Sequence, residues 1–93
     1  MMKPFRWDPG KNERLSQERG VSFEQITVAV ENGDLLQVVQ HQNVAKYPRQ
    51  KIMIVGIDGY AYLVPFVEET DCLFLKTIIP SRKATRDFIK GKA

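Results

Sequence analysis

The residues with the clearest capacity for chemistry form a basic run near the C-terminus, Pro-Ser-Arg-Lys-Ala-Thr-Arg at positions 80–86. On a helix that begins at Arg82, helical spacing puts Arg82, Thr85 and Arg86 on one face, and Lys83 projects elsewhere. Cations at a helix start are slightly unfavourable for the helix alone. An anionic ligand reverses this effect, because the helix dipole, the free amides and the guanidinium groups then act on the same charge. The run therefore predicts an anion-binding surface.

The charge distribution favours the same end of the chain. Residues 52–71 contain four acids and no base, whereas residues 72–93 contain six bases and one acid. A basic segment of this kind suits an anionic partner, either a phosphate backbone or an acidic protein. The alternative is a solvated helix face on which Arg86 pairs with Glu68 or Glu69.

A second group of polar candidates lies in the predicted first helix. Lys11 and Asn12 have no capping or packing role that the pattern identifies, so both are candidates for ligand contact. Arg19 adds a further basic group at the end of this helix. Glu18 follows Arg14 at the i, i+4 spacing, which predicts a surface ion pair between them.

Few other residues offer a reactive group. His41 at a strand end is either a general base or a structural or solvated histidine, and a single histidine excludes a multi-histidine metal site. Tyr60 and Tyr62 share one face of their strand, where they either stack bases or lie half-buried. The sequence has no glycine-rich phosphate loop, so we expect no cofactor. It also has no cluster of metal ligands, so we expect no metal ion.

Length and composition predict a single domain over residues 1–93. Cys72 is the only cysteine and lies in an apolar run, which predicts a buried and unreactive thiol. One cysteine and no signal-peptide pattern favour the reducing cytoplasm. The longest apolar runs have five or six residues, so no segment is expected to span a membrane.

The elements that must position these residues have recognisable ends. Asp8, followed by proline, predicts a helix over residues 9–19 that ends at Gly20. Ser22 and Gln25 form the pattern of a capping box at the start of a second helix. The N-terminal aromatic residues just before the first helix alternate with a polar one, which indicates a short strand or extended arm.

The remaining chain has the alternation and the turns of a sheet. Strands are expected over residues 35–41, 51–57, 60–67 and 72–79. Asp58-Gly59 predicts a tight hairpin, and Pro65 belongs at an edge or a bulge. Ser81 then caps a closing helix over residues 82–90. The expected fold is α+β, with two N-terminal helices, a three- to four-stranded antiparallel sheet and a C-terminal helix, and with the helices stacked on one face of the sheet.

Three blocks of the sequence, at residues 5–12, 19–24 and 79–86, resemble the BrnT family of toxins. They read Phe-Arg-Trp-Asp-Pro-Gly-Lys-Asn, Arg-Gly-Val-Ser-Phe-Glu and Ile-Pro-Ser-Arg-Lys-Ala-Thr-Arg. The resemblance implies a ribonuclease toxin of a type II toxin–antitoxin pair with a fold like that of the RelE and ParE toxins. It also implies a small DNA-binding antitoxin that neutralises the toxin and represses the operon.

The resemblance further implies metal-independent chemistry, in which basic residues hold an RNA phosphate while the ribose 2′-hydroxyl attacks it. Arg82 would stabilise the developing charge on the phosphorane, and Lys11, Asn12 and Arg86 would position the substrate. We therefore expect catalytic roles for Arg82, Arg86 and Lys11, and RNA contacts from Asn12, Arg19, Lys83 and Thr85.

Two positions depart from the family pattern. Family members commonly read Lys-His-Gly where this chain reads Glu18-Arg19-Gly20, so the histidine that could act as a general base is replaced. The family often carries an arginine after the middle turn, and residues 58–62 here contain none. The alternative is a non-catalytic toxin-like domain that binds a partner protein or nucleic acid through its basic C-terminal face. The sparsely apolar first helix also points to a dimer or to a hetero-oligomer with the antitoxin.

Overall fold

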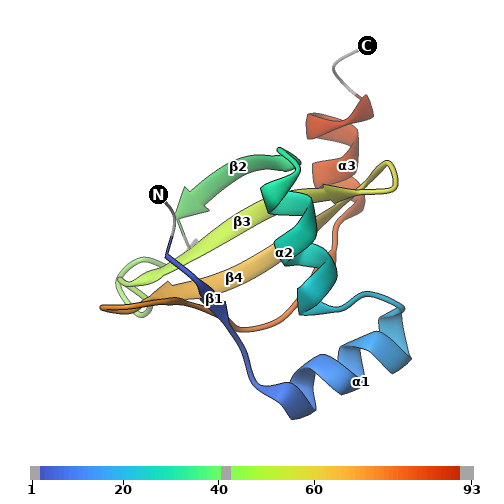
Figure 1. Ribbon diagram of the computed structural model, residues 1–93. Coiled ribbons are helices and arrows are strands. Elements are labelled where there is room, and N and C mark those ends of the chain that lie inside the picture. The colour runs from blue at the N-terminus through green and yellow to red at the C-terminus, as the bar shows by residue number, and fades with distance from the viewer. Residues whose placement is uncertain (1–2, 41–42, 91–93) are drawn as a thin grey trace.

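The computed structural model describes residues 3–40 and 43–90 and has an α+β architecture (Figure 1). In chain order the elements are β1 (Phe5–Arg6), α1 (Pro9–Arg19), α2 (Phe23–Glu31), β2 (Leu35–Gln40), β3 (Gln50–Ile57), β4 (Tyr60–Glu68), β5 (Leu73–Leu75), β6 (Ile79–Pro80) and α3 (Arg82–Phe88). None of the helices in these described ranges is long and apolar enough to cross a bilayer.

Both N-terminal helices begin at the predicted residues, and α1 also ends where expected. The Asp8 side chain accepts a hydrogen bond from the Gly10 amide at the start of α1, and Gly20 ends α1 in the left-handed conformation, with φ of 68°. At the start of α2, Ser22 and Gln25 each bond the other's backbone amide. Local capping chemistry therefore explains these boundaries, and the predictions for both helices are confirmed.

The sheet has more strands than expected. It contains six strands. Five of them follow the order β1-β5-β4-β3-β2, and β6 pairs with β4 on the same edge as β5. The prediction of a three- to four-stranded antiparallel sheet was therefore wrong, since β1 pairs with β5 in parallel. The Leu73 amide donates to the Pro4 carbonyl at 2.9 Å, which ties the N-terminal arm to the sheet. Alternation identified this arm, but its partner strand lies too far along the chain for local patterns to reveal.

The predicted last strand, 72–79, is broken into β5 and β6. β4 pairs with β5 from Phe66 onward and with β6 at Leu63 and before, so Pro65 lies at the break. The Pro65 carbonyl accepts from the Lys76 amide at 2.8 Å, which shows that the nitrogen of Pro65 also faces this side. A proline has no N–H to donate to a neighbouring strand. β4 tolerates Pro65 because neither β5 nor β6 pairs with β4 at this position.

The hairpin between β3 and β4 forms at the predicted turn. Asp58 and Gly59 both have positive φ angles, 53° and 78°, as a two-residue type I′ turn requires. The bounds of β3 and β4 lie within one residue of the prediction. The predicted end of the preceding strand, at His41, lies outside the described residues.

The main core lies between the two N-terminal helices and one face of the sheet. Phe23 and Ile26 of α2 are fully buried there, and Figure 1 shows α2 crossing in front of β3 and β4. Trp7 stacks on Phe23 with the ring centroids 5.5 Å apart. The core includes Leu15, Val21, Phe23, Ile26, Ala29, Met53, Val55, Val64, Phe66, Leu73, Leu75 and Ile78.

A second, smaller core lies on the opposite face of the sheet, under α3. Ile54 of β3, Ala61 of β4 and Ala84 of α3 form its buried centre. Alternate residues of a strand point to opposite faces, so Ile54 belongs to this core while its neighbours belong to the main core. The prediction that the helices are stacked on one face was therefore wrong, because α3 covers the face that α1 and α2 leave open.

Candidate functional site

Basic side chains of α1 line a small hollow. It measures about 350 Å³ and lies between α1 and the segment that joins β5 to β6. Its lining residues are Lys11, Arg14, Leu15, Glu18, Arg19 and Thr77. Arg19 Nη1 donates to the Ile78 carbonyl at 2.7 Å, and this bond fixes the end of α1 against that segment. The structure thus brings together two of the predicted site residues, Lys11 and Arg19.

Arg14 contributes a third cation to this hollow. The predicted ion pair between Arg14 and Glu18 was wrong, since the ion pairs among the described residues do not include it. Arg14 therefore faces the hollow without a carboxylate bonded to it. A concave, polar surface with three cations attracts anions more strongly than an isolated lysine or arginine does.

The exposed face of α3 carries a second group of cations. Arg82, Lys83 and Arg86 are all exposed. Arg86 Nε lies 3.3 Å from Asp87 Oδ1, and both side chains are largely solvated, so this ion pair is weak. The alternative pairing of Arg86 with Glu68 or Glu69 was therefore wrong. All three cations remain accessible to an anionic ligand.

Thr85 lies on the buried side of α3. It is 3% exposed, which corrects the expectation that it shares a face with Arg82 and Arg86. Its hydroxyl accepts from the Ala61 amide and donates to the Ser81 carbonyl, each at 2.8 Å. The Ser81 amide in turn donates to the Ala61 carbonyl at 3.0 Å. Thr85 therefore attaches the start of α3 to β4 and sets the position of the cations on that helix.

Asn12 joins α1 to the start of α2. Its Oδ1 accepts from the Phe23 amide at 2.7 Å, and its Nδ2 donates to Glu24 Oε1 at 2.8 Å. The bond from Asn12 is the main reason that the pKa of Glu24 lies below its usual value. Asn12 thus has the capping role that its sequence neighbours did not reveal, because the helix that it caps begins eleven residues later.

The basic residues fall into two groups that are joined by the chain. The α1 group lines its hollow, and no residue of α3 belongs to that lining in the described structure. Arg19 holds Ile78, and the chain runs from there through β6 to the cap at Ser81 and into α3. The same short segment therefore positions both groups.

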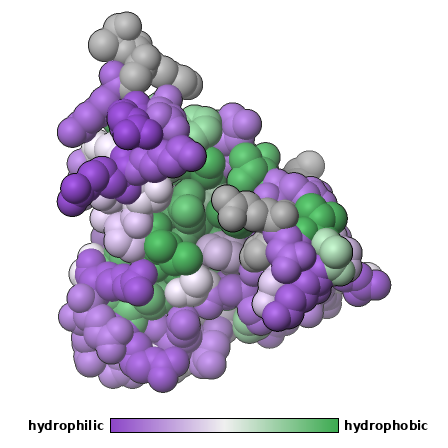
Figure 2. All heavy atoms as spheres, turned by 180° about the vertical axis from the view of Figure 1, so that it is seen from behind, coloured by the Kyte–Doolittle hydropathy of each residue, from purple (hydrophilic) through white to green (hydrophobic). Residues whose placement is uncertain are grey.

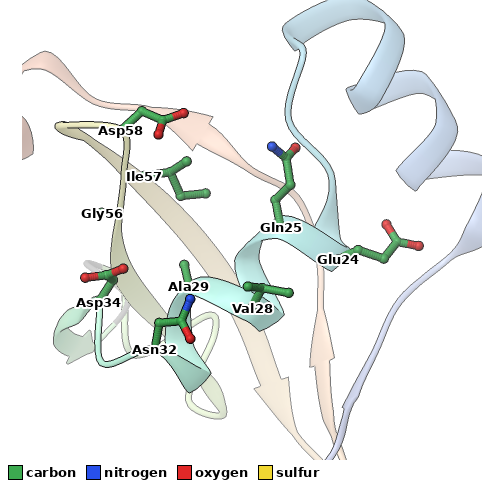
Figure 3. Close-up of a pocket in the computed structure, with 9 residues that line it drawn as sticks. All are labelled: Glu24, Gln25, Val28, Ala29, Asn32, Asp34, Gly56, Ile57 and Asp58. Carbon is green, nitrogen blue, oxygen red and sulfur yellow. The ribbon is translucent and has the colours of Figure 1, made fainter.

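Another hollow, larger than the one beside α1, is lined by acidic side chains. It measures about 410 Å³ and opens between α2 and the β3–β4 hairpin (Figure 3). Glu24, Asp34 and Asp58 lie around it, together with the apolar side chains of Val28 and Ile57. Three carboxylates repel a phosphate, so this hollow is unsuited to the anion that the basic groups would bind. Sequence reasoning missed it, because the three acids come from separate parts of the chain: Glu24 from α2, Asp34 from the turn before β2 and Asp58 from the β3–β4 turn.

The other reactive candidates have structural surroundings. Tyr60 and Tyr62 meet edge to face with their centroids 5.7 Å apart and are half-buried, as one of the two interpretations predicted. Cys72 is 3% exposed, and burial together with the hydrogen bond to Glu69 raises the pKa of its thiol. Among the described residues, no three His, Cys, Asp or Glu side chains lie close enough together to hold a metal ion, and His41 lies outside these residues.

The fold and the site define a small α+β protein that presents two groups of accessible cations to an anionic ligand. A family model described as ribonuclease toxin, BrnT, of type II toxin–antitoxin systems matches residues 7–87, which is most of the chain. The chain therefore belongs to the BrnT family, whose members are ribonuclease toxins with RNA as substrate and an antitoxin as partner. No curated protein and no solved structure matches it.

Proposed function

We propose that this chain cleaves RNA without a metal ion in the cytoplasm and that a ribbon-helix-helix antitoxin neutralises it. The observation that carries the proposal is the cationic hollow of α1, where Lys11, Arg14 and Arg19 surround a space open to an anionic ligand. Arg19 stands where the family commonly has a histidine, so the hollow includes the position to which the resemblance assigns proton transfer. The exposed Arg82, at the start of α3, provides the complementary cation.

In the proposed reaction the ribose 2′-oxygen attacks the adjacent phosphorus and the bond to the 5′-oxygen breaks. The leaving 5′-oxygen takes up a proton from water, so that a cyclic phosphate and a free 5′-hydroxyl result. The negative charge that develops on the phosphorane is stabilised by Arg82 and Arg86, with Lys11 holding the phosphate. Lys83 and Arg19 contact the neighbouring RNA backbone.

Proton transfer requires a group that can accept the proton of the 2′-hydroxyl. Glu18 is the carboxylate among the residues that line the hollow, one position before the arginine that replaces the histidine. We assign the general base to Glu18. Asn12 and Thr85, whose polar atoms are already bonded within the fold, act as positioning residues.

The test is cleavage of a labelled single-stranded RNA by the purified protein in the presence of a chelator. Wild-type protein should cleave, and Arg82→Ala and Lys11→Met should each lower the rate by about 100-fold, the typical effect of losing one electrostatic contact to the transition state. Lys46→Ala is the matched control, because Lys46 is exposed in the connection between β2 and β3. No cleavage by wild-type protein, or cleavage only with added metal, would contradict the proposal.

A second candidate function is binding without catalysis. Two observations favour it: Arg19 replaces a histidine and bonds the backbone at Ile78, and the β3–β4 turn carries Asp58 where the family often has an arginine nearby. Such a domain would bind RNA with an affinity that falls steeply with salt, because bound cations of the nucleic acid are released. RNA binding by wild-type protein without any cleavage would favour this candidate over the first.

A further inference from the structure

One edge of the sheet is formed by β2. This strand ends the order β1-β5-β4-β3-β2 and pairs, among the residues that the structure describes, with β3 alone. Figure 1 shows β2 as the outermost strand on its side of the sheet. In an edge strand, alternate N–H and carbonyl groups point away from the sheet, where they can bond a further strand.

β2 lacks the features that usually keep an edge strand from pairing. Natural edges often carry a lysine, a proline or a bulge, each of which opposes the approach of another strand. The six residues of β2 read Leu-Leu-Gln-Val-Val-Gln, without a charge or a proline. Its pairing with β3 is irregular between Leu35 and Gln37, whereas the register from Gln37 to Gln40 is regular. The second half of β2 is therefore suited to pairing with another strand.

Apolar side chains lie on both faces of this edge. Val38 is 45% exposed. Val39 points to the opposite face, where it lines a groove of about 340 Å³ beside α3, together with Ile52 and Leu63. Figure 2, which views the molecule from behind, shows hydrophobic side chains gathered beside the polar surface of α3. A strand added to β2 removes apolar surface from water on both faces, which favours its binding.

The charges around β2 indicate the kind of partner. Residues 21–45 contain no lysine or arginine, and the acids Glu31 and Asp34 precede the strand, so this part of the chain offers no cation to an RNA phosphate. An uncharged strand with free backbone groups and exposed valines matches another strand of the same kind. A second copy of β2 has these properties, and its approach requires no charge to be buried.

Symmetry then determines how two copies of β2 can pair. A two-fold axis perpendicular to the sheet makes the two strands antiparallel. Residues directly opposite each other must point to the same face, so the axis passes between one residue and its own copy. With the axis at Val38, the two Val38 side chains meet and Gln37 lies opposite Val39. The two Asp34 residues are then about 26 Å apart along the strands, beyond the screening length of about 8–10 Å at physiological salt.

We infer that two copies of this chain associate through antiparallel pairing of their β2 strands, so that the two sheets become one continuous sheet. A single pair of short strands gives a small contact area, and association therefore depends on protein concentration. The hollow beside α1 and the exposed cations of α3 do not belong to this edge, so the inference goes beyond the proposed function and does not depend on it.

Two exposed valines give a matched test. Val38→Lys puts like charges opposite each other at the axis and should weaken dimerisation by about tenfold or more. Val28→Lys replaces a valine of α2 that is 54% exposed, and should change dimerisation by less than about twofold. Sedimentation velocity over a range of concentrations measures the fraction of dimer, and circular dichroism checks that each variant keeps its fold.

Hydrogen exchange tests the backbone pairing directly. In wild-type protein, the amides of residues 37–40 that point away from β3 should exchange more slowly as the protein concentration rises. The same amides should exchange at a rate independent of concentration in Val38→Lys. In a third experiment, a short bis-maleimide should cross-link Val38→Cys into a covalent dimer and leave Val28→Cys monomeric, because Cys72 is only 3% exposed.

Three results would overturn the inference. The first is a wild-type protein that stays monomeric up to the highest concentration that remains in solution. The second is a dimer that Val38→Lys and Val28→Lys weaken equally, which would assign the contact to another surface. The third is protection of β2 amides only after the antitoxin is added, which would show that the antitoxin and not a second copy supplies the added strand.

Discussion

Replacement of Thr85 by valine tests whether this residue positions α3 or contacts RNA. The substitution keeps the shape of the side chain and removes the hydroxyl that accepts from the Ala61 amide at 2.8 Å. Both residues are buried, with 3% and 0% exposure, so water cannot replace the lost acceptor. The Ser81 carbonyl keeps a partner, because the Thr85 amide also donates to it at 3.0 Å. The variant therefore leaves one buried donor unsatisfied.

An unsatisfied buried N–H costs about 1–3 kcal/mol of the free energy of unfolding. In a domain of this size, each kcal/mol lowers the melting temperature by roughly 4–8 °C. Urea unfolding, followed through the fluorescence of Trp7, measures the change, since Trp7 stacks on the buried Phe23 ring. The slope of the transition should stay constant, because the surface exposed on unfolding is the same.

Thr27→Val is the matched control. Its hydroxyl donates to the Phe23 carbonyl within α2, so its removal leaves no buried N–H without an acceptor. The control should lose less than about 0.5 kcal/mol. A Thr85→Val protein as stable as wild type would refute the reasoning. If that protein also failed to cleave RNA, Thr85 would act at the substrate and not within the fold.

Two further predictions concern α1 and the N-terminal arm. Asn12→Ala should lower the free energy of unfolding by about 0.5–2 kcal/mol, because the Phe23 amide loses its acceptor, and chemical denaturation should show this loss with little change in RNA affinity. The contact from Lys3 to Glu68 holds the pKa of the Glu68 carboxyl below its usual value of 4.5. The stabilising effect of this ion pair is therefore present above pH 4.5 and is lost as the pH falls through the lowered pKa. Lys3→Met should therefore be less stable than wild type at neutral pH, and the two urea midpoints should converge in acid; a gap that stays constant with pH would contradict this assignment.

Helix ends and the hairpin were predictable because their signals are local. Asp8, Gly20 and Ser22 act on amides or angles within a few residues, and Asp58-Gly59 determines its turn alone. Strand partners were less predictable. Alternation reveals neither the parallel pairing of β1 with β5 nor the break between β5 and β6 that begins at Lys76. Both depend on strands that are distant in sequence.

The candidate site shows the same division. Sequence alone identified which residues are basic and, through the resemblance of three blocks, the family to which the chain belongs. It made Asn12 a candidate for ligand contact because no local partner was evident, and Thr85 because helical spacing placed it beside the arginines. Their partners within the fold, Phe23 and Ala61, come within hydrogen-bond distance only when the chain is folded.

The sequence by itself determined where the two N-terminal helices begin, where the β3–β4 hairpin turns, the chemistry of the cations and the family. The tertiary structure decided which cations meet in one hollow, which polar residues are already bonded, and which face of the sheet α3 covers. The physical reason is range, since capping and turn formation act over a few residues, whereas side-chain burial and site geometry depend on contacts between segments that are far apart in the chain.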